Sequence, residues 1–334
     1  MHQMLVPVRN RSGETYLVLK SDLEHLIRER KIEQFRRSDG WLDIDEDQRK
    51  QDRAGYTGPE RRACKLVDFS LFPLPVKEQM RKTHAVETVL GYGQRAREIV
   101  LEVKVVAKTS LSVLIQGKTG TGKGLVALML HQLSKRKDKP FIKMGCGTMP
   151  PTLIEGELFG KKGSPGRLGL AQGGTIFLDD IASLSLDMQK RLLGFFEERD
   201  APHRVRSVKP DVRVVSATTV DLMDQVLRNQ FRRDLFYRLN EFEIDLPSLT
   251  ERPDDISYLA AKFLCMANAE LGKHIFGFSE KAIDFLSGRD WSGNILELKN
   301  LIRRAILFTD ELIDAEHLSI ADGSALFRLV HSPR

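Results

Sequence analysis

The sequence predicts an α/β protein in which helices cover both faces of a parallel sheet. A glycine-rich turn at 117–124 (GKTGTGKG) follows an apolar run at 111–115 and precedes a helical pattern at 125–133. A second apolar run, within GGTIFLDD at 173–180, ends in two carboxylates. Further apolar runs alternate with helical patterns, as they do in proteins that are built on a parallel sheet. These runs lie at 141–144 and 212–217, and a helical pattern precedes the turn at 95–107.

The turn at 117–124 has the composition and context of a P-loop, the phosphate-binding turn between a strand and a helix. Its glycines allow tight backbone turns whose N–H groups point at phosphate oxygens, and the helix N-terminus adds partial positive charge. Lys123 is expected to reach the β- and γ-phosphates. The alternative is a glycine turn with a solvated lysine. The predicted nucleotide-binding residues are Gly117, Lys118, Thr119, Gly120, Thr121, Gly122, Lys123 and Gly124.

Two carboxylates end the run at 173–180 and predict a metal site. Asp179 stands where a Walker-B aspartate holds Mg²⁺ against the P-loop phosphates, and Asp180 would orient the attacking water. Thr218 follows the run at 212–217, where the carboxyl edge of a parallel sheet meets its ligand. Gly124 departs from the P-loop pattern, because a Ser or Thr usually follows the lysine and helps to hold Mg²⁺.

The length of 334 residues allows two or three domains. We expect a small α+β module and linker at 1–80, a nucleotide-binding domain at 85–248, a helical lid at 249–322 and a tail at 323–334. Net charge is +6, which suits a mildly basic cytoplasmic protein better than a dedicated nucleic-acid binder. No apolar run reaches membrane-spanning length and no signal peptide opens the chain, so we expect no membrane partner.

The N-terminal module is predicted from local patterns alone. A strand is expected at 15–19, a helix at 22–31 with Ser21 as its cap, and a hairpin over 32–44 with an Asp-Gly turn. The polar stretch at 49–65 is basic, and a solvated tether is favoured there over a contact with nucleic acid. In the lid, helices are predicted to begin at 280 and to span 295–308.

Six ordered blocks resemble the central domain of the sigma-54-dependent transcriptional activators, a bacterial branch of the AAA+ ATPases. They are GKTGTGKG, GELFG at 156–160, GGTIFLDD, FRRDLFYRLN at 231–240, LPSLTERPDDI at 246–256 and WSGNILELKN at 291–300. The resemblance spans about residues 86–319. It implies a P-loop AAA+ sheet sandwiched by helices and followed by a helical lid, with ATP and Mg²⁺ as cofactors.

The resemblance also implies an assembly and partners. Family members form rings, usually of six or seven subunits, with ATP at the subunit interfaces. Arg232 and Arg238 match the arginines that reach the neighbouring subunit's γ-phosphate; the alternative is a pair of surface arginines on a helix. Thr218 matches the sensor residue after the fourth strand. A partner in the transcription machinery, or a regulatory protein, is implied.

Several positions depart from the family pattern. Only the stretch KKGSPGRLGLAQ at 161–172 separates ELFG from GGT, and it contains no GAFTGA-like string for gripping the sigma factor. The family's switch asparagine and glutamate match Gly145 and Asp180, and its second-sensor arginine matches Leu296. Position 124 is usually Glu in this family, unlike the Ser or Thr of other P-loops, and here it is Gly. Residues 321–334 leave no room for the family's helix-turn-helix, so sequence-specific DNA binding is not expected.

Two hypotheses follow. The first is a ring-forming AAA+ ATPase of transcription control with slow hydrolysis and no direct contact of the GAFTGA type; it rests on Lys123, Asp179, Thr218, Arg232 and Arg238. The second is a non-hydrolysing, ATP-responsive scaffold or co-regulator that acts through its N-terminal module. It rests on the departures at 124, 145, 180 and 296. The arginines favour residual ATPase activity.

Overall fold

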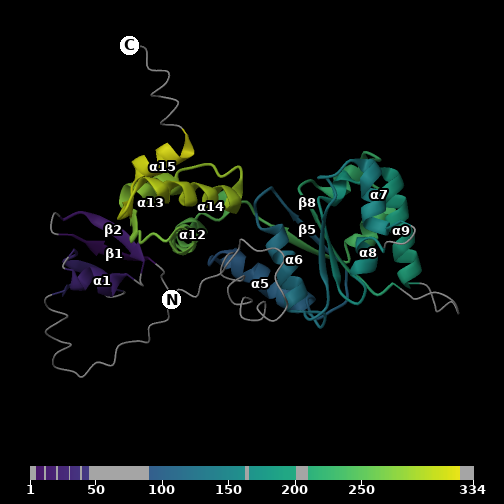
Figure 1. The fold of residues 1–334 in the computed structure, drawn as a ribbon, viewed down its shortest axis with the longest axis horizontal. Coiled ribbons are helices and arrows are strands. Elements are labelled where there is room, and N and C mark those ends of the chain that lie inside the picture. Colours follow the sequence, from purple (N-terminus) through teal and green to yellow (C-terminus); the bar gives the residue numbers. More distant parts are fainter. Residues whose placement is uncertain are drawn as a thin grey trace, which may run out of the picture. The chain divides into compact units, whose positions relative to one another are not determined.

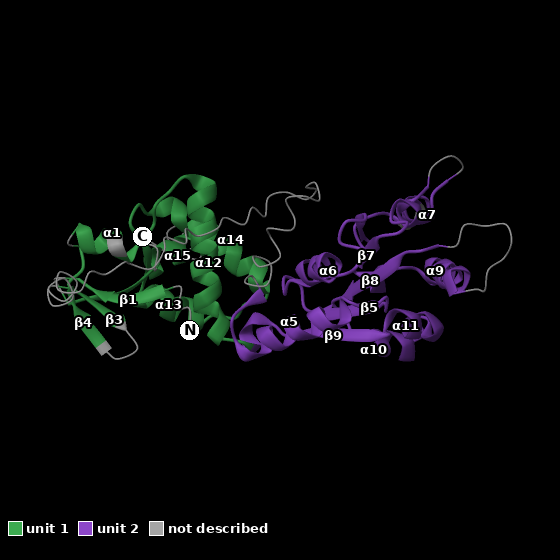
Figure 2. Cartoon of the chain, turned by 90° about the horizontal axis from the view of Figure 1, so that it is seen from below, with its two compact units in different colours: residues 1–72, 252–334 green, residues 73–251 purple. Residues whose placement is uncertain are grey.

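The computed structural model describes residues 5–10, 13–19, 22–29, 31–37, 40–44, 90–161, 165–200 and 210–323 (Figure 1). The chain divides into two units, which are residues 73–251 and residues 1–72 together with 252–334 (Figure 2). Among the described residues, no helix is both long enough and apolar enough to cross a membrane.

A five-stranded parallel sheet forms the centre of residues 73–251. Its strands lie in the order β6-β7-β8-β5-β9, and every neighbouring pair is parallel. The strands are β5 (Val113–Gly117), β6 (Phe141–Gly145), β7 (Thr175–Asp179), β8 (Arg213–Thr218) and β9 (Phe242–Leu246). The predicted fold class is confirmed. β5 lies between β8 and β9, so the turn that follows it opens at the inner part of the sheet's carboxyl edge.

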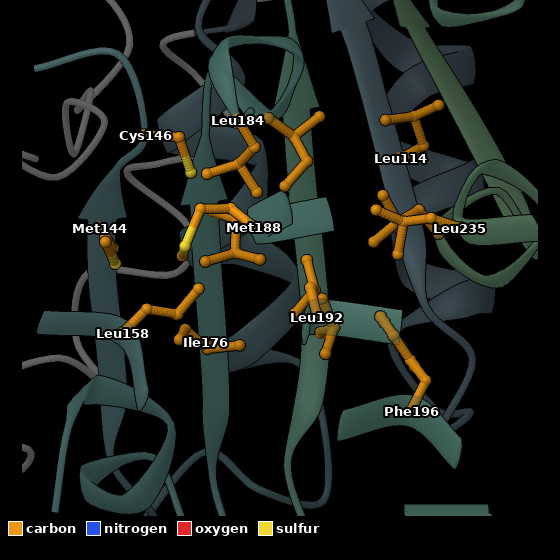
Figure 3. Packing of buried hydrophobic residues seen from close by; sticks show 14 of the residues in the cluster. Leu114, Met144, Cys146, Leu158, Ile176, Leu184, Met188, Leu192, Phe196 and Leu235 are labelled. Atoms are coloured by element: carbon orange, nitrogen blue, oxygen red, sulfur yellow. The ribbon is translucent and has the colours of Figure 1, made fainter. Parts of the chain in front are cut away.

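Helices cover both faces of this sheet, because successive side chains on each buried strand point to opposite faces. On β7, Ile176 and Leu178 belong to one apolar core, whereas Phe177 between them belongs to the other. The first core is packed by α7 (Pro151–Phe159), α9 (Leu186–Asp200), α10 (Leu222–Leu227) and α11 (Arg233–Leu239). Figure 3 shows part of it. The second is packed by α5 (Gln94–Val106) and α6 (Lys123–Gln132).

The P-loop strand lies two residues later than predicted. β5 begins at Val113, and its last residues, Gln116 and Gly117, pair with Asp245 and Leu246 of β9. Leu111 precedes the strand and is exposed. Hydrogen bonding to β9 therefore extends the strand to the first glycine of the turn, where apolar character alone would have ended it.

Residues of both chain ends share the sheet of the other unit. Its six strands lie in the order β11-β10-β2-β1-β3-β4. The N-terminal strands are β1 (Leu5–Arg9), β2 (Thr15–Leu19), β3 (Gln34–Arg37) and β4 (Gly40–Asp43), and the C-terminal ones are β10 (Gly277–Ser279) and β11 (Leu312–Ile313). β2 pairs antiparallel with β10, and Leu19 N donates to Phe276 O at 2.8 Å. The N-terminal strands are thus joined to the lid and do not form the separate module that we expected.

The local predictions for the N-terminal residues are largely confirmed. β2 has the predicted bounds, and β3 and β4 form the predicted antiparallel hairpin. Gly40 pairs with Arg37 as the first residue of β4, so it lies in the strand and not in the turn. The helix α1 (Leu23–Arg28) is shorter than predicted. Ser21 and the basic stretch at 49–65 lie outside the described residues.

Four helices make up the lid. They are α12 (Asp254–Leu271), α13 (Glu280–Ser287), α14 (Asn294–Ala305) and α15 (Ala315–Asp322). The predicted start at 280 is confirmed, and the predicted helix at 295–308 is α14 followed by a short 3₁₀ turn (Ile306–Phe308). Trp291, which precedes α14, is buried and donates its Nε1–H to Leu286 O at 3.1 Å. The helical character of the lid is confirmed.

Candidate nucleotide-binding site

The glycine-rich turn runs from the end of β5 to the start of α6, as the sequence predicts. Gly120 has a φ of 78° and Gly122 a φ of 104°, which lie in the left-handed region that glycine adopts without steric cost. At Gly117, a Cβ atom would lie 2.8 Å from the carbonyl oxygen of Leu246 on β9. Glycine is therefore required here both for the turn and for the close approach of the two strands. Such a turn places backbone N–H groups around an anion.

Lys123 is held inside this turn. Its side chain is buried, and its Nζ donates to Gly117 O at 2.6 Å and to Lys118 O at 2.9 Å. Burial lowers the pKa of Lys123, and the charges of Asp179 and Asp180 oppose that shift. The lysine is thus bonded to the loop carbonyls and is close enough to the two carboxylates to feel their charge, as expected for a lysine that meets a triphosphate.

The remaining turn residues divide into structural and exposed ones. Thr121 is buried, and its Oγ1 donates to Lys118 O at 2.8 Å, which fixes the loop on itself. The side chains of Lys118 and Thr119 are exposed. Gly124 lies in the first turn of α6 and brings no side-chain oxygen to the site.

Asp179 ends β7 beside the turn, and its carboxylate is paired. Asp179 Oδ2 lies 3.1 Å from Nζ of Lys143, a residue of the neighbouring strand β6. The side chain of Asp179 is 32% exposed, so it lies at the edge of the site and not within the core. Asp179, the predicted metal ligand, is therefore already paired with the ammonium group of Lys143.

Asp180 lies in a strained position that turns its carboxylate toward its own loop. Its φ is 59°, which is uncommon for a residue with a side chain. Asp180 Oδ2 accepts a hydrogen bond from Ser183 Oγ at 2.5 Å. A Cβ atom at Gly147 would collide with this carboxylate, so the glycine there leaves it room. The predicted water-orienting group is thus held by Ser183 in this structure.

The side chains at the site fit a tightly held Mg²⁺ poorly. Mg²⁺ in nucleotide sites takes one or two carboxylates, phosphate oxygens and water in octahedral geometry. Gly124 supplies no hydroxyl, Asp179 carries the Lys143 ammonium, and Asp180 is bonded to Ser183. In the described part of the chain, no group of three or more His, Cys, Asp or Glu residues is placed to hold a metal ion.

The predicted sensor residue lies at the carboxyl edge of the same sheet. Thr218 ends β8, the strand beside β5, and it is buried. Its Oγ1 donates to Val220 O at 2.8 Å and accepts from Val220 N at 3.1 Å. The hydroxyl thus closes the turn after β8.

The two predicted arginines lie at α11 and are paired with acids of the same unit. Arg232 caps the helix and lies 2.6 Å from Asp234, and this hydrogen bond raises the pKa of the Arg232 guanidinium. Arg238, in the last turn, lies 2.6 Å from Asp200 of α9. Neither forms an ion pair with Asp179 or Asp180 here. Their ion pairs are at the surface, where such pairs contribute little to stability.

The structure thus brings together the turn, Lys123, Asp179 and Asp180, with Thr218 on the adjacent strand. Sequence reasoning missed Lys143. The signal was present in FIKMG at 141–145, because Lys143 and Gly145 alternate with the buried Met144 and so share one face of β6. The match of Leu296 to a second-sensor arginine falls on an exposed leucine of α14.

Fold and site define the chain as a P-loop protein with a helical lid. Residues 89–245 match the Sigma-54 interaction domain, and residues 250–322 match the AAA+ ATPase lid domain. The chain belongs to the family of sigma-54-dependent transcriptional activators, which confirms the resemblance.

Curated relatives support this assignment. The Transcriptional regulatory protein ZraR of Escherichia coli O157:H7 is 36% identical over 300 residues, which cover 83% of this chain and 68% of that protein. The DNA-binding transcriptional activator HyfR of Escherichia coli K12 is 40% identical over 70% of this chain and 37% of its own length. For the Nif-specific regulatory protein of Herbaspirillum seropedicae the identity is 37%, over 77% and 50%. The chain thus spans about a third to two thirds of these relatives.

Solved structures agree with the fold. NtrX from Brucella abortus in complex with ADP has a TM-score of 0.63 at 27% identity, covering 77% of this chain and 62% of that one. For NtrX in complex with ATP, the TM-score is 0.58 at 28% identity, covering 82% and 59%. Nucleotide binding is therefore a property of a structural neighbour as well as of the family.

Proposed function

We propose that this chain binds ATP at residues 117–124 and acts as a ring-forming regulator of transcription with slow hydrolysis. The observation that carries the proposal is Lys123, which is buried in a glycine turn, bonded to two loop carbonyls and influenced by the charges of Asp179 and Asp180. Loop carbonyls hold its ammonium, and a triphosphate can replace them as stronger, charged acceptors. If Mg²⁺ takes part, the triphosphate's own oxygens would hold it, because the side chains at the site fit this ion poorly.

A cytoplasmic location is also proposed, since transcription in bacteria takes place in the cytoplasm.

Slow hydrolysis is proposed from the state of the two carboxylates. Asp180 is the residue expected to orient water, but its side chain is one CH₂ shorter than the family's glutamate and is bonded to Ser183. Misplacement of a catalytic group by about 1 Å can cost about 100-fold in rate. Asp179 forms an ion pair with Lys143, so it is not an open carboxylate for a metal ion.

A ring of six or seven subunits is proposed from the family and from the two arginines. In a ring, Arg232 and Arg238 would leave Asp234 and Asp200 for the γ-phosphate of a neighbour. Both ion pairs are surface pairs, so their loss is a small cost. Thr218 would sense the nucleotide from the adjacent strand.

The non-hydrolysing co-regulator remains a second candidate, because one specific observation favours it. The ion pair between Asp179 and Lys143 removes the open carboxylate that a metal-dependent hydrolysis uses. In that case ATP would set assembly only, and the N-terminal strands joined to the lid would carry the partner contact.

Binding and assembly are tested together. A fluorescent ATP analogue is titrated into the full chain, and the mixture is then sedimented. Lys123→Ala should lose binding, because the ammonium is removed while the glycine turn remains. Arg238→Ala should keep binding but lose nucleotide-dependent assembly. Unchanged affinity of Lys123→Ala would remove the central claim, and unchanged assembly of Arg238→Ala would remove the role of that arginine.

The short connection between α7 and β7 predicts no direct sigma-54 remodelling. α7 ends at Phe159 and β7 begins at Thr175, and the helix described between them is α8 (Arg167–Leu170). In a purified transcription assay, this chain with ATP should not open a sigma-54 promoter, whereas a family activator with a GAFTGA loop should. Open complexes formed by this chain alone would contradict the proposal.

A further inference from the structure

Lys143 lies on the same face of the parallel sheet as Asp179, the predicted metal ligand. Strands β6 and β7 pair with Lys143 opposite Phe177 and Gly145 opposite Asp179. Because side chains alternate along a strand, Lys143 shares the face of Phe177 and Asp179, which α6 covers. The Lys143 Nζ lies 5.5 Å from the centre of the Phe177 ring and 3.1 Å from Asp179 Oδ2. The lysine stem therefore crosses an aromatic ring to bring its charge to the end of β7.

Gly124 leaves room for the Lys143 side chain between α6 and the sheet. A Cβ atom at position 124 would lie 3.7 Å from Lys143 Nζ and 3.7 Å from Cε1 of Phe177. A side chain at 124 would thus touch the lysine directly, and a carboxylate there would compete with Asp179 for its ammonium. With glycine at 124, α6 offers Lys143 no side chain at this position.

We propose that the Lys143 ammonium is a built-in cation on Asp179, so that this chain binds nucleoside triphosphates without depending on a divalent ion. The inference rests on the proposed ATP site. An ammonium on Asp179 neutralises a carboxylate that would otherwise repel the phosphates, and it repels a divalent cation from the same oxygens. The pair is partly exposed, with Lys143 54% and Asp179 32% accessible, so the effect is moderate and removable.

The first test measures the affinity of a fluorescent ATP analogue for the full chain in Mg²⁺ and in EDTA. For the wild type, the two dissociation constants should agree within about threefold. For Lys143→Met, binding should become tighter in Mg²⁺ than in EDTA by about five- to tenfold, the effect of one unit charge at this distance. Lys143→Arg should behave like the wild type. Lys190→Met, on the exposed face of α9, removes a lysine elsewhere and should change nothing.

A second variant pair tests the role of position 124. Gly124→Glu should draw Lys143 away from Asp179, because the new side chain starts 3.7 Å from the ammonium. It should therefore produce the same Mg²⁺ dependence as Lys143→Met. Gly124→Gln has the same size without the charge, so whatever it does to the overall affinity, the ratio of its dissociation constants in Mg²⁺ and in EDTA should stay within about threefold. Thermal unfolding of each variant checks that the fold is kept.

Direct metal binding gives a readout that does not depend on the affinity for nucleotide. Mn²⁺ titrated into the nucleotide-bound protein and followed by electron paramagnetic resonance should bind Lys143→Met about five- to tenfold more tightly than the wild type. The failures are distinguishable. A wild type that binds no nucleotide in either condition overturns the ATP site itself. Two outcomes overturn the built-in cation alone. One is a wild type that binds nucleotide strongly in Mg²⁺ and weakly in EDTA. The other is a Lys143→Met variant whose Mg²⁺ dependence equals that of the wild type.

Discussion

His131 of α6 is a titratable side chain buried in the nucleotide-binding unit. It is 1% exposed, its Nδ1 lies 3.1 Å from Thr175 Oγ1, and its ring packs against Phe141. Burial, and after it the nearby charge of Arg213, lowers the pKa of His131 to about 4. The folded protein therefore holds this imidazole neutral where the unfolded chain would protonate it.

This predicts an acid-dependent loss of stability. The ordinary pKa is 6.5, so between pH 6.5 and about 4 the unfolded chain binds a proton that the folded chain does not. The free energy of unfolding should be highest above pH 6.5, fall through that window by up to about 3 kcal/mol, and level off below it. Urea unfolding of the wild type and of His131→Gln, at several pH values, measures the slope. An equal slope in both proteins would show that another group is responsible.

At the scale of single elements, caps and register explain where helices and strands begin. Ser279 is extended, its Oγ accepts from Ala282 N at 3.1 Å, and it donates to the carboxylate of Asp314. Asp314 in turn caps α15 and accepts from Ala315 N. One serine thus links the starts of α13 and α15.

Ser279→Ala should lower the free energy of unfolding of the lid by about 1–2 kcal/mol, since it removes a helix cap and a hydrogen bond to a carboxylate. The control is Ser287→Ala, at the exposed end of the same helix, which should change it by less than about 0.5 kcal/mol. Chemical unfolding followed by circular dichroism compares the two. Equal effects would mean that the cap carries no special stability.

The longest described helix, α12, was not predicted, although its signal is in the sequence. Ile256, Leu259, Ala260, Phe263 and Leu264 are all buried and follow the helical spacing of three and four residues. Acidic residues open its first turn after a proline, as helix starts often do. The periodicity was sufficient to find the element.

At the scale of the whole molecule, the pairing of β2 with β10 joins two segments that lie far apart in the chain. β10 is short, and Gly277 approaches β2 so closely that a Cβ atom would collide with Leu17 O. The apolar cluster of the N-terminal strands is also contacted by Phe276. Stability of the N-terminal strands therefore depends on the lid.

Gly277→Ala should separate β2 from β10. Hydrogen exchange followed by mass spectrometry should show faster exchange at residues 15–19, because Leu19 N loses its acceptor on Phe276. Gly194→Ala provides the control, because nothing lies within 4 Å of a Cβ there. Unchanged protection in Gly277→Ala would show that the N-terminal strands are stable without the lid.

By itself, the sequence determined the sheet class, the glycine turn with Lys123 and the carboxylates after β7, because each is a contiguous pattern of strand, turn and helix. Only the tertiary structure decided that Lys143 lies on Asp179, that Asp180 is bonded to Ser183, and that β2 joins the lid. The physical reason is strand pairing. Register between strands sets which side chains meet across a sheet, and this register depends on partners that local patterns do not name.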